Sequence, residues 1–183
     1  PMGERRRGLA HRPDEPTPRQ SSADAAVTRR SAGLLLFRRA AAGLEVLLVH
    51  PGGPYWAKKD DGAWSLPKGE IEPDDDERAT ALRELAEELG PSAPAADPEA
   101  LIALGSIRQK AGKEVVAWAL EADFDPATLA SNTFEMEWPP RTGRRQSFPE
   151  ADRAEWFDLD TAARKINAAQ AELLARLAVR VGD

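Results

Sequence analysis

The chain has 183 residues and a mass of 19.9 kDa, which suits one domain with a hydrophobic core. It contains no cysteine, which excludes disulfides and thiolate metal sites, and its net charge of −6 argues against a platform for nucleic acid. No apolar run approaches the roughly 20 residues that cross a bilayer, and no signal-peptide apolar region follows the arginine-rich start, so we expect a cytoplasmic protein without membrane or nucleic-acid partners.

Residues 1–30 differ in composition from the rest of the chain. They are rich in Arg, Pro, Ser and Ala, and their apolar residues follow neither a helical nor a strand period. Arginines outnumber acidic residues seven to four in this segment, so it is basic while the remainder is acidic. We therefore expect a flexible basic tail over residues 1–30, followed by one domain over residues 31–183.

Two short apolar runs after the tail predict neighbouring strands, at residues 31–37 and 44–50. A long loop with several glycines follows, and residues 64–67 predict a short strand at its end. His50 ends the second strand, where we expect a surface histidine rather than a catalytic one.

The stretch of residues 69–91 combines a glycine turn, three aspartates and an acidic helix. Gly69 permits a turn that other residues resist, and the aspartates at 74–76 cap the start of the helix. Successive helical residues are about 100° apart, which brings three glutamates within an arc of about 100°: Glu84, Glu87 and Glu88. The residues that we expect to pack against a sheet lie on the opposite side: Leu82, Leu85, Ala86 and Leu89.

Carboxylates that are gathered on one helix face repel one another and therefore favour bound cations. Oxygen ligands select hard divalent ions, so we expect Mg²⁺ to bind here, with Mn²⁺ as a substitute. The alternative is the solvated acidic face of an ordinary amphipathic helix. The structured loop in front of the helix favours the metal site.

Beyond the helix, residues 101–108 and 114–124 predict two strands around a turn. An irregular stretch is expected at 125–149, then a final strand at 153–157. Two helices are expected at the end of the chain, at residues 158–166 and 170–181. This order predicts an α/β fold in which helices cover a mixed sheet.

The acidic segment resembles the Nudix box, whose pattern is Gly, five residues, Glu, seven residues, Arg-Glu, an aliphatic, any residue, Glu-Glu, any residue, Gly and an aliphatic. Asp75 stands where the family has the first glutamate, and Pro91 stands where it has the last aliphatic. The matching residues keep the family's spacing: Gly69, Arg83, Glu84, Leu85, Glu87, Glu88 and Gly90. The resemblance covers roughly residues 31–167 and implies the Nudix fold, an α/β/α sandwich with a mixed central sheet.

Within that MutT-like superfamily, the sequences SAGLLLFRR and W-x-x-PKG are most similar to the dinucleoside polyphosphate (Ap4A-type) hydrolases. The resemblance implies a divalent-metal-dependent pyrophosphohydrolase that cleaves a nucleoside diphosphate linked to another group, with Ap4A to Ap6A as favoured substrates. Hydrolysis of nucleoside triphosphates of the oxidised dGTP type or of ADP-ribose is the alternative. A ligand-binding regulator without turnover is a third reading.

The resemblance also implies roles for individual residues. Glu84, Glu87 and Glu88 are expected to bind the metal, and Glu84 or Glu88 is also a candidate for proton transfer. Arg83 is expected to orient Glu84 and Asp75 through charged hydrogen bonds. Glu150 lies six residues before Trp156 and is the leading candidate for a distal base or extra ligand. A solvent-facing loop position is its alternative, and Glu135 and Glu137 compete for its role.

Contacts with a nucleotide or dinucleotide substrate are assigned to basic and aromatic side chains. Phosphate binding is expected of several cations: Lys58, Lys59, Lys68 and Arg145, with Arg141 and Arg144 near the last. Tyr55 is expected to stack on a base, as are the other aromatic residues of these loops: Trp56, Phe134 and Trp138. The alternatives are surface solubility for the cations and packing at the core edge for the aromatic residues. The oligomeric state is left open.

Overall fold

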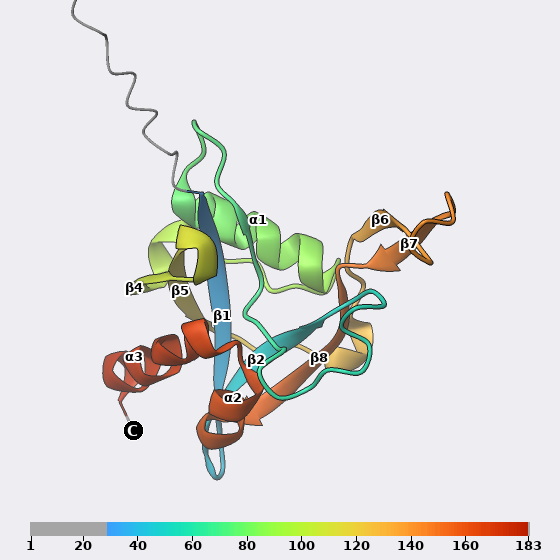
Figure 1. Cartoon of the computed structure of the whole chain (residues 1–183). Helices are drawn as coiled ribbons and strands as arrows, with labels where there is room; N and C mark the ends of the chain where they lie inside the picture. The colour runs from blue at the N-terminus through green and yellow to red at the C-terminus, as the bar shows by residue number, and fades with distance from the viewer. Residues whose placement is uncertain (1–28, 183) are drawn as a thin grey trace, which may run out of the picture.

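The computed structural model describes residues 29–182. The tail predicted for residues 1–30 lies outside them except for its last two residues, and Arg30 already begins the first strand. Figure 1 shows a mixed sheet with helices on both sides and a hairpin that projects from it. The sheet order is β4-β5-β1-β2-β8, and β3 pairs with β1. These strands are β1 (Arg30–Ala40), β2 (Gly43–Pro51), β3 (Lys68–Glu70), β4 (Ile102–Arg108), β5 (Glu114–Glu121) and β8 (Ala151–Asp158).

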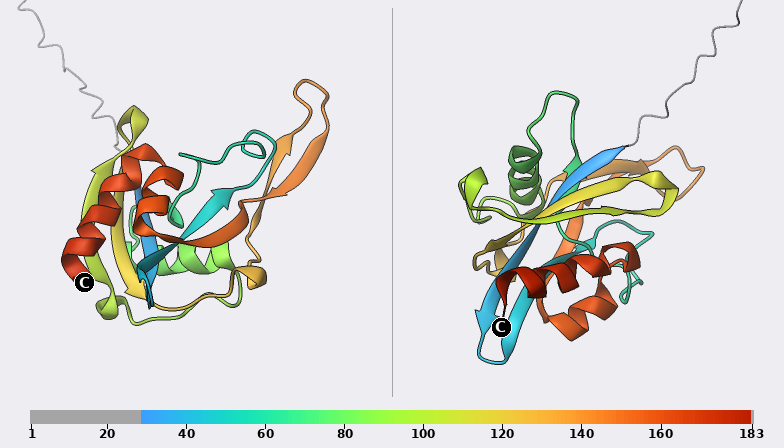
Figure 2. Two further views of the ribbon diagram at one scale, coloured as in Figure 1. Left: turned by 90° about the horizontal axis from the view of Figure 1, so that it is seen from below. Right: turned by 90° about the vertical axis from the view of Figure 1, so that its left-hand side faces the viewer.

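The central strand β1 is buried on both faces, which explains its almost continuous apolar sequence. Leu34 and Leu36 belong to the core under α1 (Glu77–Leu89), whereas Leu35 and Phe37 belong to the core on the opposite face. That second face is covered by α2 (Leu159–Lys165) and α3 (Ala171–Val181), as both views of Figure 2 show. β1 runs parallel to β5 and antiparallel to β2 and β3, so the predicted α/β sandwich with a mixed sheet is confirmed.

Helix α1 begins after Asp76, whose side chain accepts a hydrogen bond from the Ala79 N–H at 2.9 Å. The helix buries Ala81, Leu85 and Leu89, while Leu82 is only half-buried. The prediction that Ala86 packs against the sheet is wrong, because that residue is exposed. The helix is turned so that Ala81 faces the sheet instead, and this rotation carries two of its glutamates towards β3.

The short strand expected at residues 64–67 is displaced to β3. Trp64 and Ser65 each form only one isolated bridge, although Trp64 is fully buried. Proline has no N–H to donate to a ladder, so Pro67 contributes only its carbonyl, which accepts from the Leu34 N–H at 3.0 Å. The regular pairing with β1 therefore begins one residue later, at Lys68.

The stretch expected to be irregular, residues 125–149, contains the projecting hairpin. Its strands are β6 (Thr133–Glu137) and β7 (Arg145–Pro149), and Phe134 is paired with Phe148. The hairpin is a separate two-stranded sheet that extends past the end of α1 in Figure 1. The described chain also has four short 3₁₀ turns, η1 (Pro98–Ala100), η2 (Lys110–Gly112), η3 (Pro126–Thr128) and η4 (Ala168–Gln170). Among residues 29–182, no helix is long and apolar enough to cross a membrane.

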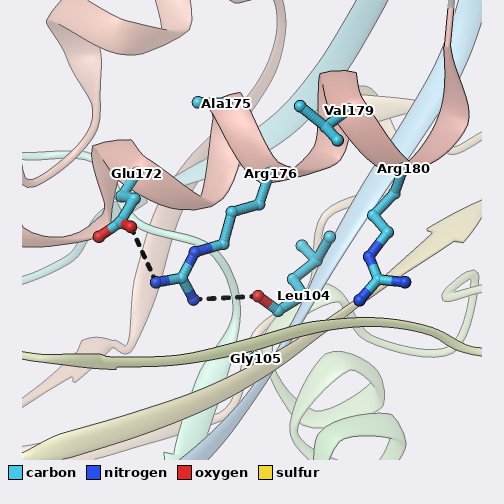
Figure 3. Close-up of a pocket in the computed structure, with 7 residues that line it drawn as sticks. All are labelled: Leu104, Gly105, Glu172, Ala175, Arg176, Val179 and Arg180. Carbon is cyan, nitrogen blue, oxygen red and sulfur yellow. Dashed lines mark hydrogen bonds and ion pairs between the residues drawn. The ribbon is translucent and has the colours of Figure 1, made fainter.

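Arg176 connects α3 to the edge strand β4 through hydrogen bonds (Figure 3). Its guanidinium donates to the carbonyls of Leu104 at 3.0 Å and Ser106 at 2.9 Å, and it pairs with Glu172 at 2.9 Å. We expect Arg176→Ala to lower the free energy of unfolding by about 1–2 kcal/mol, because two edge carbonyls lose a charged donor. Urea denaturation would measure the change. Arg180→Ala, on the exposed end of the same helix, is the matched control, and equal losses in the two variants would contradict the assignment.

Candidate active site

Glu88 is the most deeply placed glutamate of α1. Its Oε1 accepts a hydrogen bond from the backbone N–H of Lys68 at 3.3 Å, which ties the helix to the start of β3. Burial raises the pKa of Glu88 to about 8 against the opposing influence of Lys68, and the charges of Glu150 and Glu84 add to the increase. The site therefore contains a carboxyl group that is costly to ionise unless a cation is added.

Glu84 packs directly on Gly69. Its side chain is only 14% exposed, and a Cβ atom built on Gly69 would lie 2.0 Å from its carboxyl carbon. The glycine that the sequence suggested for a turn is therefore needed for the close approach of a carboxylate. Burial, followed by the charge of Glu87, raises the pKa of Glu84, while the neighbouring Arg83 lowers it.

Arg83 makes both of the contacts predicted for it. Its guanidinium donates to Asp75 Oδ2 at 3.1 Å and to Glu84 Oε1 at 3.4 Å, and it lies 3.9 Å from Glu87 Oε1. Asp75 thus reaches the arginine although it is one methylene shorter than the glutamate of the family pattern. The arginine holds the loop in front of α1 against the acidic face of the helix.

Glu150 lies between β7 and β8. Its N–H donates to the Asn132 carbonyl at 2.8 Å, and its own carbonyl accepts from the Gly52 N–H at 3.0 Å. Burial and then the charge of Glu87 raise the pKa of Glu150. The backbone therefore holds Glu150, 62 positions along the chain from Glu88, within electrostatic reach of the α1 glutamates.

The two competing glutamates make their contacts inside the hairpin. Glu135 lies 3.7 Å from Arg145, and the Glu137 carboxylate accepts from the Gly143 N–H at 3.1 Å. The charge of Glu150, by contrast, raises the pKa of both Glu84 and Glu88. Glu150 is therefore the better candidate for the distal base or extra ligand.

The donor set fits a hard divalent cation. Glu84, Glu87, Glu88 and Glu150 offer only carboxylate oxygens, and three of them resist ionisation. Among residues 29–182, no three Asp, Glu or His side chains are close enough to form a complete metal cage. Mg²⁺ is commonly held by one or two carboxylates together with water and substrate phosphates, so an open carboxylate group suits it.

Lys68 is the substrate candidate that lies nearest to the glutamates. Its side chain is half-buried, and burial lowers its pKa, while Glu88 and Glu84 raise it and Lys113 lowers it further. Because the charge of Lys113 acts on Lys68, a second lysine lies near the site, and no sequence motif predicted it. Both positive groups could meet an anionic substrate beside the carboxylates.

The remaining substrate candidates lie on the loop after β2 and on the hairpin. Tyr55 is 57% exposed and meets Trp138 edge to face, with ring centroids 5.4 Å apart. Lys58 and Lys59 are exposed, and the Lys59 ammonium lies 4.8 Å from the ring centroid of Trp56. Arg145 pairs with Glu135 in the hairpin, as described above. Phe134 packs against Gly53, where an added Cβ would lie 3.0 Å from its ring.

The expectation of a surface histidine at position 50 is wrong. His50 is fully buried, with Nδ1 2.7 Å from Asp152 and Nε2 2.6 Å from the Lys59 carbonyl. A carbonyl can only accept, so Nε2 carries a proton and holds the loop. The alternation of β2 predicts this inward direction, because His50 shares a face with Val46 and Leu48.

The raised pKa of Glu88 predicts an unusual pH dependence of stability. Between pH 4.5 and about 8 the folded metal-free protein holds a proton that the unfolded chain releases. The free energy of unfolding should therefore fall as pH rises through this window, by up to roughly 5 kcal/mol. Thermal unfolding in a chelating buffer would measure the fall.

Glu88→Gln is the matched control for this experiment, because it removes the group with the largest shift and should make the fall of stability with pH much shallower, although Glu84 and Glu150 still contribute. Added Mg²⁺ should stabilise the wild-type protein most at the alkaline end, where the carboxylates are ionised. A wild-type stability that rises between pH 5 and 8 would contradict the assigned burial of Glu88.

Comparison with known proteins agrees with this geometry. The sequence matches the family described as NUDIX domain over residues 18–177, a range that begins inside the predicted tail. No curated protein sequence matches the chain.

Three solved structures of similar fold illustrate the range of relatives. A C. elegans Ap4A hydrolase in a binary complex is 23% identical, with a TM-score of 0.54 over 81% of this chain and 96% of its own. The NUDIX domain of Shewanella oneidensis NrtR, complexed with ADP ribose, is 19% identical, with a TM-score of 0.56 over 85% and 89%. A MutT/nudix family protein from Enterococcus faecalis is 18% identical, with a TM-score of 0.55 over 83% and 62%.

These three similarities concern the fold, whereas the family match covers most of the chain and includes the acidic helix, its preceding loop and Glu150. The chain belongs to the Nudix family and is a hydrolase that acts on phosphoanhydrides.

Proposed function

We propose that the protein is a Mg²⁺-dependent pyrophosphohydrolase of nucleotides, with dinucleoside polyphosphates as the favoured substrates. The observation that carries the proposal is the group of four carboxylates, Glu84, Glu87, Glu88 and Glu150, of which three have raised pKa values. Ionising these neighbouring carboxylates costs free energy in the absence of cations, and bound cations offset that cost. The cytoplasmic location predicted from composition stays a prediction.

Each residue has a distinct part in the proposed reaction. Glu84, Glu87 and Glu88 would hold Mg²⁺, and Mn²⁺ would substitute for it. When bound, the ion neutralises phosphate charge and makes a bound water more acidic. Glu150 would take a proton from the attacking water, because the backbone holds it within electrostatic reach of the α1 glutamates. Arg83 would keep Glu84 oriented, and Lys68 would contact a phosphate.

The preference for a dinucleotide is supported by the outer contacts. Exposed Tyr55, which meets half-buried Trp138 edge to face, offers aromatic surface for a base, and Lys58, Lys59 and Arg145 are exposed cations on the same loop and hairpin. The similarity in fold to the C. elegans Ap4A hydrolase agrees with this preference. ADP-ribose is the second candidate, favoured by the similarity to the NUDIX domain of NrtR in its complex with ADP ribose.

A substrate panel tests the proposal. The full chain would be incubated with Mg²⁺ and, separately, with dinucleoside tetra- to hexaphosphates, ADP-ribose and oxidised dGTP, and the products separated by chromatography. Hydrolysis that favours the dinucleoside polyphosphates supports the proposal. Loss of ADP-ribose alone would overturn the favoured substrate, and no turnover of any compound would overturn the proposed action on nucleotides.

A further inference from the structure

A second pocket lies on the face of the sheet opposite to α1. It has a volume of about 510 Å³ and is enclosed by the turn between β4 and β5, by η4 and by Gly62. Its polar lining consists of Lys110, Lys113, Gln109 and Asn167, and the rest of the lining is alanine and glycine. The volume is within the usual range for small-molecule sites.

The register of β3 connects this pocket with the carboxylates. Gly69 is opposite Ala32, which belongs to the core under α1, and Lys68 is opposite Gly33. Successive strand residues point to opposite faces, so Lys68 points to the face that carries the pocket. The charges of Glu88, Lys113 and Glu84 all act on Lys68. Lys68 thus extends from the strand beside the acidic helix towards the pocket's side of the sheet, where the charges of Glu88 and Lys113 both act on it.

The lining of the pocket suits an anion. Among residues 29–182, neither Lys110 nor Lys113 forms an ion pair with a carboxylate. Asp60 and Asp61, which precede Gly62, are paired with Lys165 at 2.6 and 3.1 Å. The Asn167 oxygen accepts from the Ala169 N–H at 3.0 Å, which leaves its amide N–H groups to donate. With no aromatic lining residue to stack on a base, these groups match phosphate oxygens.

We propose that this pocket binds the phosphate groups of the substrate that lie beyond the cleaved bond, with Lys110 and Lys113 as the binding residues and Lys68 on the path to them. The inference rests on the proposed function and narrows its substrate class. A dinucleoside tetraphosphate or longer has phosphates outside the two that the cleaved bond joins. ADP-ribose has none, so it gains nothing from these lysines.

Binding of inorganic tripolyphosphate tests the pocket separately from turnover. The full chain would be titrated without divalent cations, with the side-chain amide NMR signals of Gln109 and Asn167 as the readout. We expect saturable shifts of both signals in the wild-type protein. The double variant Lys110→Gln/Lys113→Gln should raise the Kd at least about tenfold, because charged hydrogen bonds are lost. Arg180→Gln, a cation on the exposed end of α3, is the control and should leave the Kd unchanged.

Unshifted amide signals, or equal Kd values in the wild-type protein and the double variant, would overturn the proposal. Enzyme kinetics then distinguish a failure of the pocket assignment from a failure of the proposed function. If the pocket binds tripolyphosphate but no phosphoanhydride is hydrolysed, the proposed function fails and the anion site stands. If the chain hydrolyses dinucleoside polyphosphates, the double variant should raise KM for these substrates at least about tenfold and leave ADP-ribose hydrolysis unchanged. An equal change for both substrates would overturn the assigned role.

Discussion

The Glu87→Gln variant is expected to lower kcat/KM for phosphoanhydride hydrolysis by at least about a hundredfold, because it removes one of the charges that stabilise the transition state through the cation. Its stability should change little. The Glu87 side chain is 40% exposed, and its only ion pair is the 3.9 Å contact with Arg83 among the described residues. Steady-state kinetics with Mg²⁺, together with thermal unfolding, would separate the two effects.

Glu77→Gln is the matched control, since Glu77 lies in the first turn of the same helix and pairs with Arg30 rather than with the carboxylate group. It should keep almost full activity. If Glu87→Gln also retains activity, the metal-ligand role of Glu87 is wrong. Equal losses in the two variants would point to a general effect on the helix instead.

The Gly69→Ala variant should lower kcat/KM almost as much as Glu87→Gln, although it changes no charge. The added methyl group would lie 2.0 to 2.4 Å from the carboxyl atoms of Glu84, so the carboxylate has to move. A displacement of about 1 Å from a productive position can cost a factor of about 100 in rate. The crowding should also cost about 1–3 kcal/mol of stability. Kinetics and urea denaturation of the purified variant would measure both losses.

A double-mutant cycle tests whether Gly69→Ala lowers kcat/KM by displacing the Glu84 carboxylate. If Gly69 acts through Glu84, then adding Gly69→Ala to a Glu84→Gln variant should lower kcat/KM by much less than a hundredfold. Fully additive losses would show that the glycine matters for another reason, such as the path of the β3 loop.

The elements that the sequence predicted well are those with an uninterrupted burial pattern. β1 and β2 are buried along most of their length, and α3 places Leu173, Leu174 and Leu177 in the core at helical spacing. The acidic helix was located by its spacing and its cap. These patterns depend on nearby residues alone, which is why one sequence suffices to find them.

Features that depend on distant contacts were missed. β6 alternates polar and apolar residues, but Phe134 and Met136 are only half-buried, and β7 has a single half-buried position, so neither strand carries the strong apolar signal of a core strand. The exposure of Ala86 was missed because the roll of α1 is set by Glu84 and Glu88 meeting β3, a contact between separate elements. The burial of His50 depends in the same way on Asp152 and the Lys59 carbonyl.

The residues of the candidate site also divide into those that local patterns predicted and those that depend on distant contacts. Nudix spacing located Arg83, Glu84, Glu87 and Glu88, and the resemblance also suggested Glu150. The proximity of Lys113 to Lys68 follows from the parallel pairing of β1 with β5 and the antiparallel pairing of β1 with β3, which no local pattern encodes. The pocket beyond Lys68 was therefore outside the reach of motif analysis.

Titration with Mn²⁺, followed by the electron paramagnetic resonance signal of the free ion, tests most directly whether the acidic face of α1 binds divalent cations. The wild-type chain should remove Mn²⁺ from solution at a saturable site, with Mg²⁺ competing for it. The triple variant Glu84→Gln/Glu87→Gln/Glu88→Gln should leave the ion free at the same concentrations while it stays folded. Equal Mn²⁺ binding by the folded triple variant and the wild-type chain would contradict the account.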